Sequence, residues 1–138
     1  KIDPNAVLPT RKHHSEAGLD IYANSDFIIP PHSSSIITTG ITIEIDEGFV
    51  GLLKPKGRNN HLLGAGVVDA GYQGEILVKV VNISENPMNI QSGDAIGQLL
   101  IVPIYSPSVM EVSLNEIHKN DSSRRNTGGI VDQFSSLK

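Results

Sequence analysis

Short strand-forming runs separated by turn residues constrain the fold of this 138-residue chain more than any other feature. Apolar and polar residues alternate in ITTGITIEI and EILVKVVNI, as they do in strands with one buried face. No long amphipathic helix is visible, and at most a helical turn or two is expected near 113–118. The pattern predicts an all-β domain, closed or sandwiched. The predicted strands are 27–30, 35–45, 50–53, 75–83, 88–90 and 98–104.

Composition narrows the classes of function that this chain can serve. We expect one domain over residues 1–120, followed by a polar C-terminal arm over 121–138. The net charge of −4 argues against general binding of nucleic acid. No apolar run is long enough to cross a membrane, and the lack of cysteine suits a cytoplasmic protein. The paired His13 and His14 are expected to be solvated, and no protein metal site is predicted.

The segment 64–77, GAGVVDAGYQGEIL, is the strongest candidate for a functional site. It places Asp69 among glycines and small residues, ahead of a strand. Glycines let a ligand approach main-chain N–H and C=O groups closely. The alternative is an ordinary hairpin in which Asp69 caps a turn and Tyr72 packs on its neighbour. The segment alone leaves both interpretations open.

The segments before and after it, taken in order along the chain, decide between these two interpretations. They are AGLDIYA at 17–23, TTGITIEI at 38–45, GLLKPKGRNN at 51–60, GVVDAGYQGE at 66–75, SGDAIGQLLIVP at 92–103 and RRNTGG at 124–129. From about residue 10 to residue 130 the chain resembles the trimeric dUTPase family. The resemblance implies a distorted β-barrel or jelly roll, and a homotrimer with a swapped C-terminal arm. It also implies hydrolysis of dUTP to dUMP and pyrophosphate.

The resemblance also implies a role for individual residues. Asp69 would activate the water that attacks the α-phosphorus, and Asp20 would support the site by holding Lys56 or Arg58. Tyr72 would lie under the deoxyribose and exclude a 2′-hydroxyl. The other implied substrate contacts are Gly57, Gly66, Val67, Val68, Gln98, Arg125, Gly128 and Gly129. Mg²⁺ would be bound mainly through the triphosphate, and each site would combine residues of three chains.

Two of the family's five motifs are altered. Residues 55–58 read Pro-Lys-Gly-Arg where the family usually has Pro-Arg-Ser-Gly, so the serine that steadies the leaving phosphate is missing. In the C-terminal arm, Ile130 replaces the aromatic residue that stacks on uracil, although Phe134 lies four residues further on. Asp132 stands where a small hydroxyl residue often follows.

These departures leave two alternatives to an active dUTPase. One is a dUTPase-fold protein with altered or lost catalysis that binds nucleotides or proteins. Retention of Asp20, Asp69 and Tyr72 opposes that interpretation. The other is a dCTP deaminase, which shares the fold, but Lys79 stands where that family needs a glutamate.

Overall fold

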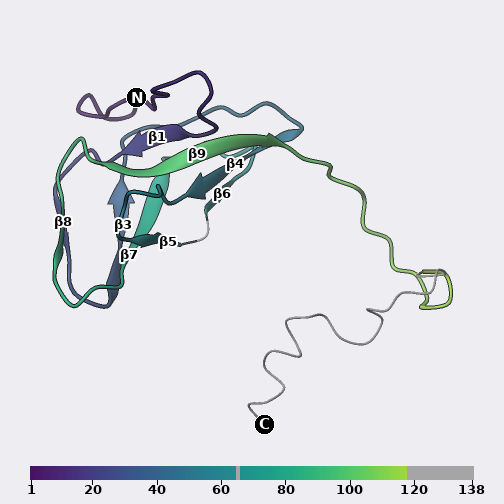
Figure 1. Ribbon diagram of the computed structural model, residues 1–138. Helices are drawn as coiled ribbons and strands as arrows, with labels where there is room; N and C mark the ends of the chain where they lie inside the picture. Colours follow the sequence, from purple (N-terminus) through teal and green to yellow (C-terminus); the bar gives the residue numbers. More distant parts are fainter. Residues whose placement is uncertain (65, 118–138) are drawn as a thin grey trace, which may run out of the picture. The chain divides into compact units, whose positions relative to one another are not determined.

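The computed structural model describes residues 1–64 and 66–117, which form two compact units. The first unit is Lys1–Ser106, and the second begins at Pro107. The described strands are β1 (Leu19–Tyr22), β2 (Phe27–Ile29), β3 (Ser33–Thr38), β4 (Phe49–Lys54), β5 (Leu62–Leu63), β6 (Gly66–Val68), β7 (Leu77–Asn82), β8 (Met88–Ile90) and β9 (Ala95–Pro103). Figure 1 shows their arrangement. The predicted boundary at residue 120 lies outside the described residues.

The strands form three antiparallel sheets. The largest has the order β1-β9-β4-β6, the second has the order β3-β7-β5, and β2 pairs with β8. The long strand β9 therefore joins segments that lie far apart in the sequence, with β1 on one side and β4 on the other (Figure 1). This sheet positions the candidate site.

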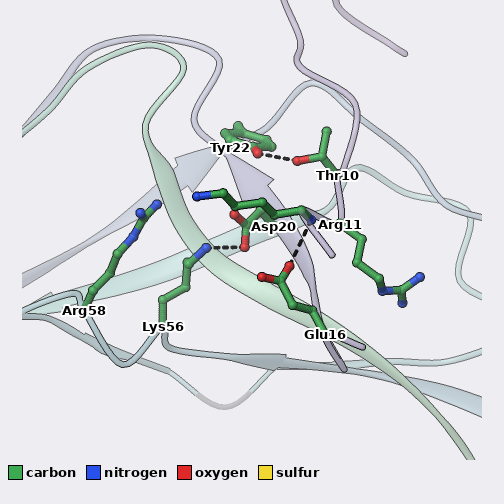
Figure 2. Close-up of a pocket in the computed structure, with 8 residues that line it drawn as sticks. Thr10, Arg11, Glu16, Asp20, Tyr22, Lys56 and Arg58 are labelled. Carbon is green, nitrogen blue, oxygen red and sulfur yellow. Dashed lines mark hydrogen bonds and ion pairs between the residues drawn. The ribbon is translucent and has the colours of Figure 1, made fainter. Parts of the chain in front are cut away.

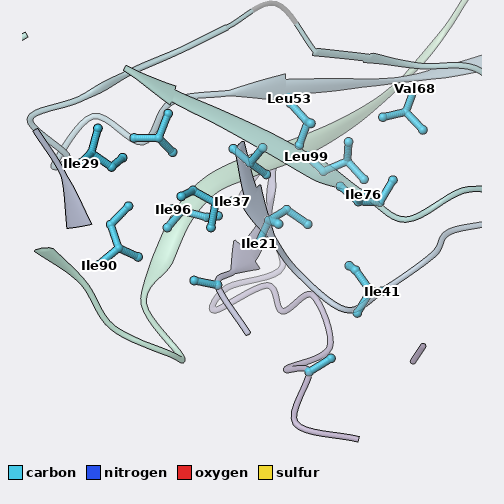
Figure 3. Packing of buried hydrophobic residues seen from close by; sticks show 14 of the residues in the cluster. Ile21, Ile29, Ile37, Ile41, Leu53, Val68, Ile76, Ile90, Ile96 and Leu99 are labelled. Carbon is cyan, nitrogen blue, oxygen red and sulfur yellow. The ribbon is translucent and has the colours of Figure 1, made fainter. Parts of the chain in front are cut away.

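A single cluster of aliphatic side chains forms the core of the first unit. Ile21 of β1, Ile37 of β3 and Leu99 of β9 are fully buried in it (Figure 3), as is Val80 of β7. The alternating positions of the strands supply these side chains, because successive residues of a strand point to opposite faces of the sheet. Burial of each such side chain stabilises the fold by about 1.5–3 kcal/mol relative to leaving it exposed.

The all-β prediction is confirmed, and the strand at 88–90 was located with its bounds. The prediction of one strand over 35–45 was wrong at its C-terminal half, because β3 ends at Thr38. Gly40 has φ +67°, which is outside the strand region. Ile41 and Ile45 are nevertheless buried, so the alternation continued where the strand pairing did not.

Three short strands, β1, β5 and β6, were not among the predicted strands. They contain two to four residues each, which is too short for alternation to be distinguished from chance. No helix in the described part of the chain is long and apolar enough to cross a membrane.

In the second unit, the helical turn expected near 113–118 is a single hydrogen-bonded turn. The Glu116 N–H donates to the Ser113 carbonyl oxygen at 3.0 Å. The Ser113 N–H and hydroxyl both donate to Glu116 Oε2 at 3.0 Å. These bonds, that of the Ser113 backbone first, lower the pKa of Glu116 below its ordinary value because they favour the ionised carboxylate.

Candidate functional site

Strand pairing brings three of the sequence segments together. In the large sheet Asp20 of β1 lies opposite Gln98 of β9, and Gln98 lies opposite Lys54 of β4. Lys56 follows β4 by two residues and therefore emerges beside Asp20 and Gln98. The register of β9 against both neighbours thus brings together, on one chain, Asp20 of the segment 17–23, Lys56 of 51–60 and Gln98 of 92–103.

Asp20 and Lys56 form an ion pair at the centre of this group (Figure 2). The Lys56 side chain retains 16% of its exposure and the Asp20 side chain 21%. A pair so largely shielded from water interacts more strongly than an exposed one. The sequence left Lys56 and Arg58 open as partners of Asp20, and the structure selects Lys56.

Gln98 is hydrogen-bonded to the loop that follows β4. Its Nε2 donates to the Pro55 carbonyl oxygen at 3.1 Å. Its side chain packs against Gly18, where an added Cβ would lie 2.3 Å from Gln98 Oε1. A glycine at position 18 is therefore required for this side chain to lie where it does.

Two clefts flank the ion pair, and both are lined by Glu16 and Arg58 in addition to the pair itself. The larger has a volume of about 500 Å³ and is lined by Thr10, Arg11, Lys12, Glu16, Asp20, Tyr22, Lys56 and Arg58. The smaller, about 360 Å³, is lined by Glu16, Ala17, Gly18, Asp20, Lys56, Gly57, Arg58 and Gln98. The larger cleft carries four cationic side chains and two carboxylates, so its charge favours an anion.

Five residues of the larger cleft, Thr10, Arg11, Lys12, Glu16 and Tyr22, were not predicted from the sequence. Arg11 and Lys12 lie shortly before the segment 17–23, and this basic pair was the signal that could have located them. Thr10 and Tyr22 join through a hydrogen bond between their hydroxyl groups (Figure 2). The Lys12 N–H donates to Glu16 Oε2 at 2.9 Å, which links two residues that line the cleft.

Arg58 differs from Lys56 in its surroundings. It is exposed, it lines both clefts, and it makes no ion pair within the described residues. Its guanidinium group offers the two-pronged donor geometry that suits phosphate. Lys56 is held by a carboxylate, and Arg58 is available to a ligand.

Asp69 and Tyr72 lie on a separate hairpin. Asp69 follows β6 and is exposed, and the Tyr72 N–H donates to its carbonyl oxygen at 3.0 Å to close a four-residue turn. The Tyr72 hydroxyl donates to the Glu75 carbonyl oxygen at 2.6 Å. The turn supports the ordinary-hairpin interpretation of the backbone, yet it leaves the Asp69 carboxylate open to solvent.

One chain does not bring this hairpin to the clefts. Val68 lies opposite Gly51 of β4, whereas the Asp20 level of the sheet is at Lys54, and β1 is three strands from β6. With about 3.3 Å per residue and about 4.8 Å between strands, the Asp20 and Asp69 Cα atoms are roughly 20 Å apart. The predicted residues Arg125, Gly128 and Gly129 lie outside the described residues.

No group of three or more His, Cys, Asp or Glu side chains in 1–64 and 66–117 is placed to hold a metal ion. The two carboxylates of the larger cleft are engaged, Asp20 by Lys56 and Glu16 by the Lys12 N–H. These residues on their own do not form a metal cage.

Comparison with known proteins gives one family. The family model described as dUTPase matches residues 4–131. The deoxyuridine 5′-triphosphate nucleotidohydrolase of Mycolicibacterium gilvum (strain PYR-GCK) is 35% identical over 136 residues, which covers 93% of this chain and 88% of that protein. The protein of the same name from Mycobacterium leprae (strain Br4923) is 33% identical over 142 residues, with 94% and 92% coverage.

Solved structures give the same result. The dUTPase of Staphylococcus bacteriophage 80alpha, determined with dUPNHPP, superposes with a TM-score of 0.81 at 26% identity and covers 92% of both chains. A mutant dUTPase from phage phi11 of S. aureus, described with a structural Mg(II) ion, has a TM-score of 0.76 at 26% identity. That match covers 80% of this chain and 92% of the phage protein.

Proposed function

The chain belongs to the dUTPase family, and we propose that it hydrolyses dUTP to dUMP and pyrophosphate. The observation that carries this proposal is the group formed by the Asp20–Lys56 ion pair, Gln98 and the exposed Arg58 around two clefts with shared lining residues. This group presents positive charge and fixed donors to an anion of several charges, as a triphosphate requires.

Asp69 is the proposed general base. Its exposed carboxylate accepts a proton from a water molecule as the water oxygen forms a bond with the α-phosphorus. The bond between the α-phosphorus and the oxygen that bridges to the β-phosphorus breaks, and pyrophosphate leaves with the bonding electron pair. Arg58 and Gln98 bind the phosphate oxygens, while Lys56 keeps the Asp20 carboxylate neutralised beside them.

The hairpin supplies selectivity for the nucleoside. Strand β6 is the outer strand of its sheet as described, so one edge of 66–68 is not paired with β4. Main-chain N–H and C=O groups at this edge can read the uracil ring, since an unpaired strand edge presents donors and acceptors at fixed spacing. Tyr72 lies under the deoxyribose and leaves no space for a 2′-hydroxyl.

The active form is proposed to be a homotrimer. The separation of roughly 20 Å between Asp20 and Asp69 supports this proposal. The two residues belong to one sheet whose strands lie about 4.8 Å apart, so the residues of a single chain stay at that separation. A second chain would supply the Asp69 hairpin to the clefts of the first. The arm of a third chain would supply Arg125, Gly128 and Gly129.

Magnesium is proposed to enter with the substrate. A phage relative is described with a structural Mg(II) ion, which supports the metal in the family only in general terms. The described residues form no cage for it, and triphosphate oxygens are ligands that Mg²⁺ prefers. When bound, the ion would neutralise charge on the triphosphate.

The test is pyrophosphate release by purified protein with Mg²⁺, compared for dUTP, dTTP, dCTP and UTP, with Asp69→Asn in parallel. Release from dUTP that the Asp69→Asn variant lacks supports the proposal. Release that survives the substitution contradicts the role of Asp69.

A non-catalytic nucleotide-binding protein is the second candidate. Gly57 favours it, because the family serine that steadies the leaving phosphate is replaced there by a residue without a side chain. A folded trimer that binds a non-hydrolysable dUTP analogue but releases no pyrophosphate from any of the four nucleotides would establish this alternative.

A further inference from the structure

The Glu75 carboxylate accepts two hydrogen bonds from successive main-chain groups. Its Oε1 lies 3.1 Å from the Thr39 nitrogen and 2.8 Å from the Gly40 nitrogen, and both N–H groups donate to it. Successive N–H groups that converge in this way form an anion-binding concavity. The hairpin is thus bound by a charged group to the segment TTGITIEI, to which the proposed mechanism gives no role.

Gly40 is essential to this geometry. Its φ of +67° lies in the left-handed region that favours glycine. An added Cβ would also lie 2.7 Å from the Asp3 Cβ and 2.9 Å from the Ala6 Cβ. The backbone conformation that forms the concavity therefore depends on glycine at this position.

The residues beside Glu75 strengthen the attachment. The Thr39 hydroxyl donates to the Ile76 carbonyl oxygen at 2.6 Å, and the Ile76 N–H donates to the Ile41 carbonyl oxygen at 2.9 Å. Thr39 and Ile76 are each only 1% exposed. Because these bonds are buried, the C-terminal end of the hairpin is fixed to the core.

The fixed position of Glu75 is passed on to Tyr72 and Asp69. The Tyr72 hydroxyl donates to the Glu75 carbonyl oxygen at 2.6 Å, and the Tyr72 N–H donates to the Asp69 carbonyl oxygen at 3.0 Å. The ring lies against Gly74, where an added Cβ would be 2.5 Å from the hydroxyl oxygen. Glu75 is the one residue of this hairpin that bonds both to Tyr72 and, by its carboxylate, to the 39–40 backbone.

We propose that Glu75 is a positioning residue. It holds the Tyr72 ring in the position from which the ring excludes a 2′-hydroxyl, and it fixes the position of Asp69 through the same hairpin. The inference rests on the proposed function and extends it from the residues that touch the nucleotide to the group that holds them. Its specific consequence is that the selectivity of dUTP over UTP depends on a carboxylate that contacts neither nucleotide.

The test compares kcat/KM for dUTP and for UTP in four variants. Glu75→Ala is expected to lower kcat/KM for dUTP about tenfold to hundredfold, since a displacement of about 1 Å in an active site has that effect. The dUTP-to-UTP ratio falls as well, because the displaced ring no longer excludes the 2′-hydroxyl. Glu75→Gln keeps the accepting oxygen and restores most of the ratio. Glu47→Ala, at an exposed glutamate, is the control and changes neither value.

Gly74→Ala provides a test that does not depend on the stability of Glu75 variants. The added methyl group meets the outer end of the exposed Tyr72 side chain, so the ring moves while the Glu75 carboxylate bonds remain. The dUTP-to-UTP ratio is expected to fall with little change in unfolding midpoint. An unchanged ratio in Gly74→Ala, or an equal loss for both nucleotides in Glu75→Ala, overturns the inference.

Amide hydrogen exchange separates this inference from the proposed function. If the wild-type protein hydrolyses neither nucleotide, the proposed function fails, and exchange at Thr39, Gly40 and Tyr72 still decides the role of Glu75. Faster exchange at all three amides in Glu75→Ala supports a connection from the carboxylate to the hairpin. Faster exchange at Thr39 and Gly40 with an unchanged Tyr72 refutes it.

Discussion

The Asp20–Lys56 ion pair is predicted to couple the two side chains more strongly than a surface pair does. The perturbation is a double-mutant cycle of Asp20→Asn, Lys56→Gln and the variant with both changes. Exposed ion pairs contribute about 0.2–1 kcal/mol. Removal of one partner from a fully buried pair costs about 3–5 kcal/mol.

The structure places this pair between those limits, because the two side chains retain 16% and 21% of their exposure. We therefore expect a coupling free energy of about 1–2 kcal/mol, which is about fivefold to thirtyfold in the unfolding equilibrium. Each single variant leaves a partly buried partner without its counter-charge. The summed losses of unfolding free energy in the two single variants should therefore exceed the loss in the double variant.

The assay is urea unfolding at one fixed protein concentration, since assembly changes apparent stability. The cycle is repeated at about 0.5 M salt, where the Debye length is shorter than the roughly 10 Å found at 0.1 M and surface pairs are weakened. The coupling should persist there. A coupling below about 0.3 kcal/mol, as found for weak surface pairs, would show that water screens the pair and would refute the reasoning.

Four further predictions follow from the same structure. Asp69→Asn should lower turnover about 10²-fold to 10⁴-fold, the usual contribution of a general base, and leave binding of a non-hydrolysable dUTP analogue intact by calorimetry. Gly57→Ser should raise turnover of dUTP, because it restores the family serine that steadies the leaving phosphate. Stability should not fall, because nothing lies within 4 Å of the position of the added Cβ, and a lowered unfolding midpoint would contradict this. Gly18→Ala should destabilise the folded protein by about 1–3 kcal/mol, because the added methyl group crowds Gln98. It should also raise KM, as steady-state kinetics would measure. The Ser113 turn should lose order in acid, because hydrogen bonds from Ser113 lower the pKa of Glu116 in the folded state below its ordinary value of 4.5. The contribution of Glu116 to the stability of the turn is full above that value and is lost as pH falls through the folded-state pKa. The chemical shift of the Ser113 amide would report the change.

The fold class could be predicted from the sequence better than the pairing of the strands. Alternation located most of the strands, yet it continued through Gly40 to Ile45, where the backbone leaves the sheet. Periodicity reports which face of the chain is buried and does not report whether a neighbouring strand is present. The buried Ile41 and Ile45 satisfied the pattern through packing alone.

The candidate site shows the same division. Asp69 and Tyr72 were singled out from a local glycine-rich pattern and Asp20 from the resemblance to the dUTPase family, and their roles in the site stay predictions. The choice of Lys56 over Arg58 as partner of Asp20 could not be made in this way. It depends on the register of β4 and β1 against β9, which is set by contacts between residues far apart in the chain.

Residue types, their alternation and the turn residues were enough to indicate an all-β chain, because strand propensity and turn chemistry act between near neighbours. The motif segments from 17–23 to 124–129 carried the resemblance to the dUTPase family. The ion pair, the attachment of Glu75 to residues 39–40 and the distance between Asp20 and Asp69 were decided only when the strands paired. Those features are set by hydrogen bonds and packing across sequence separations of more than thirty residues, such as the 36 between Asp20 and Lys56, where no local pattern carries information.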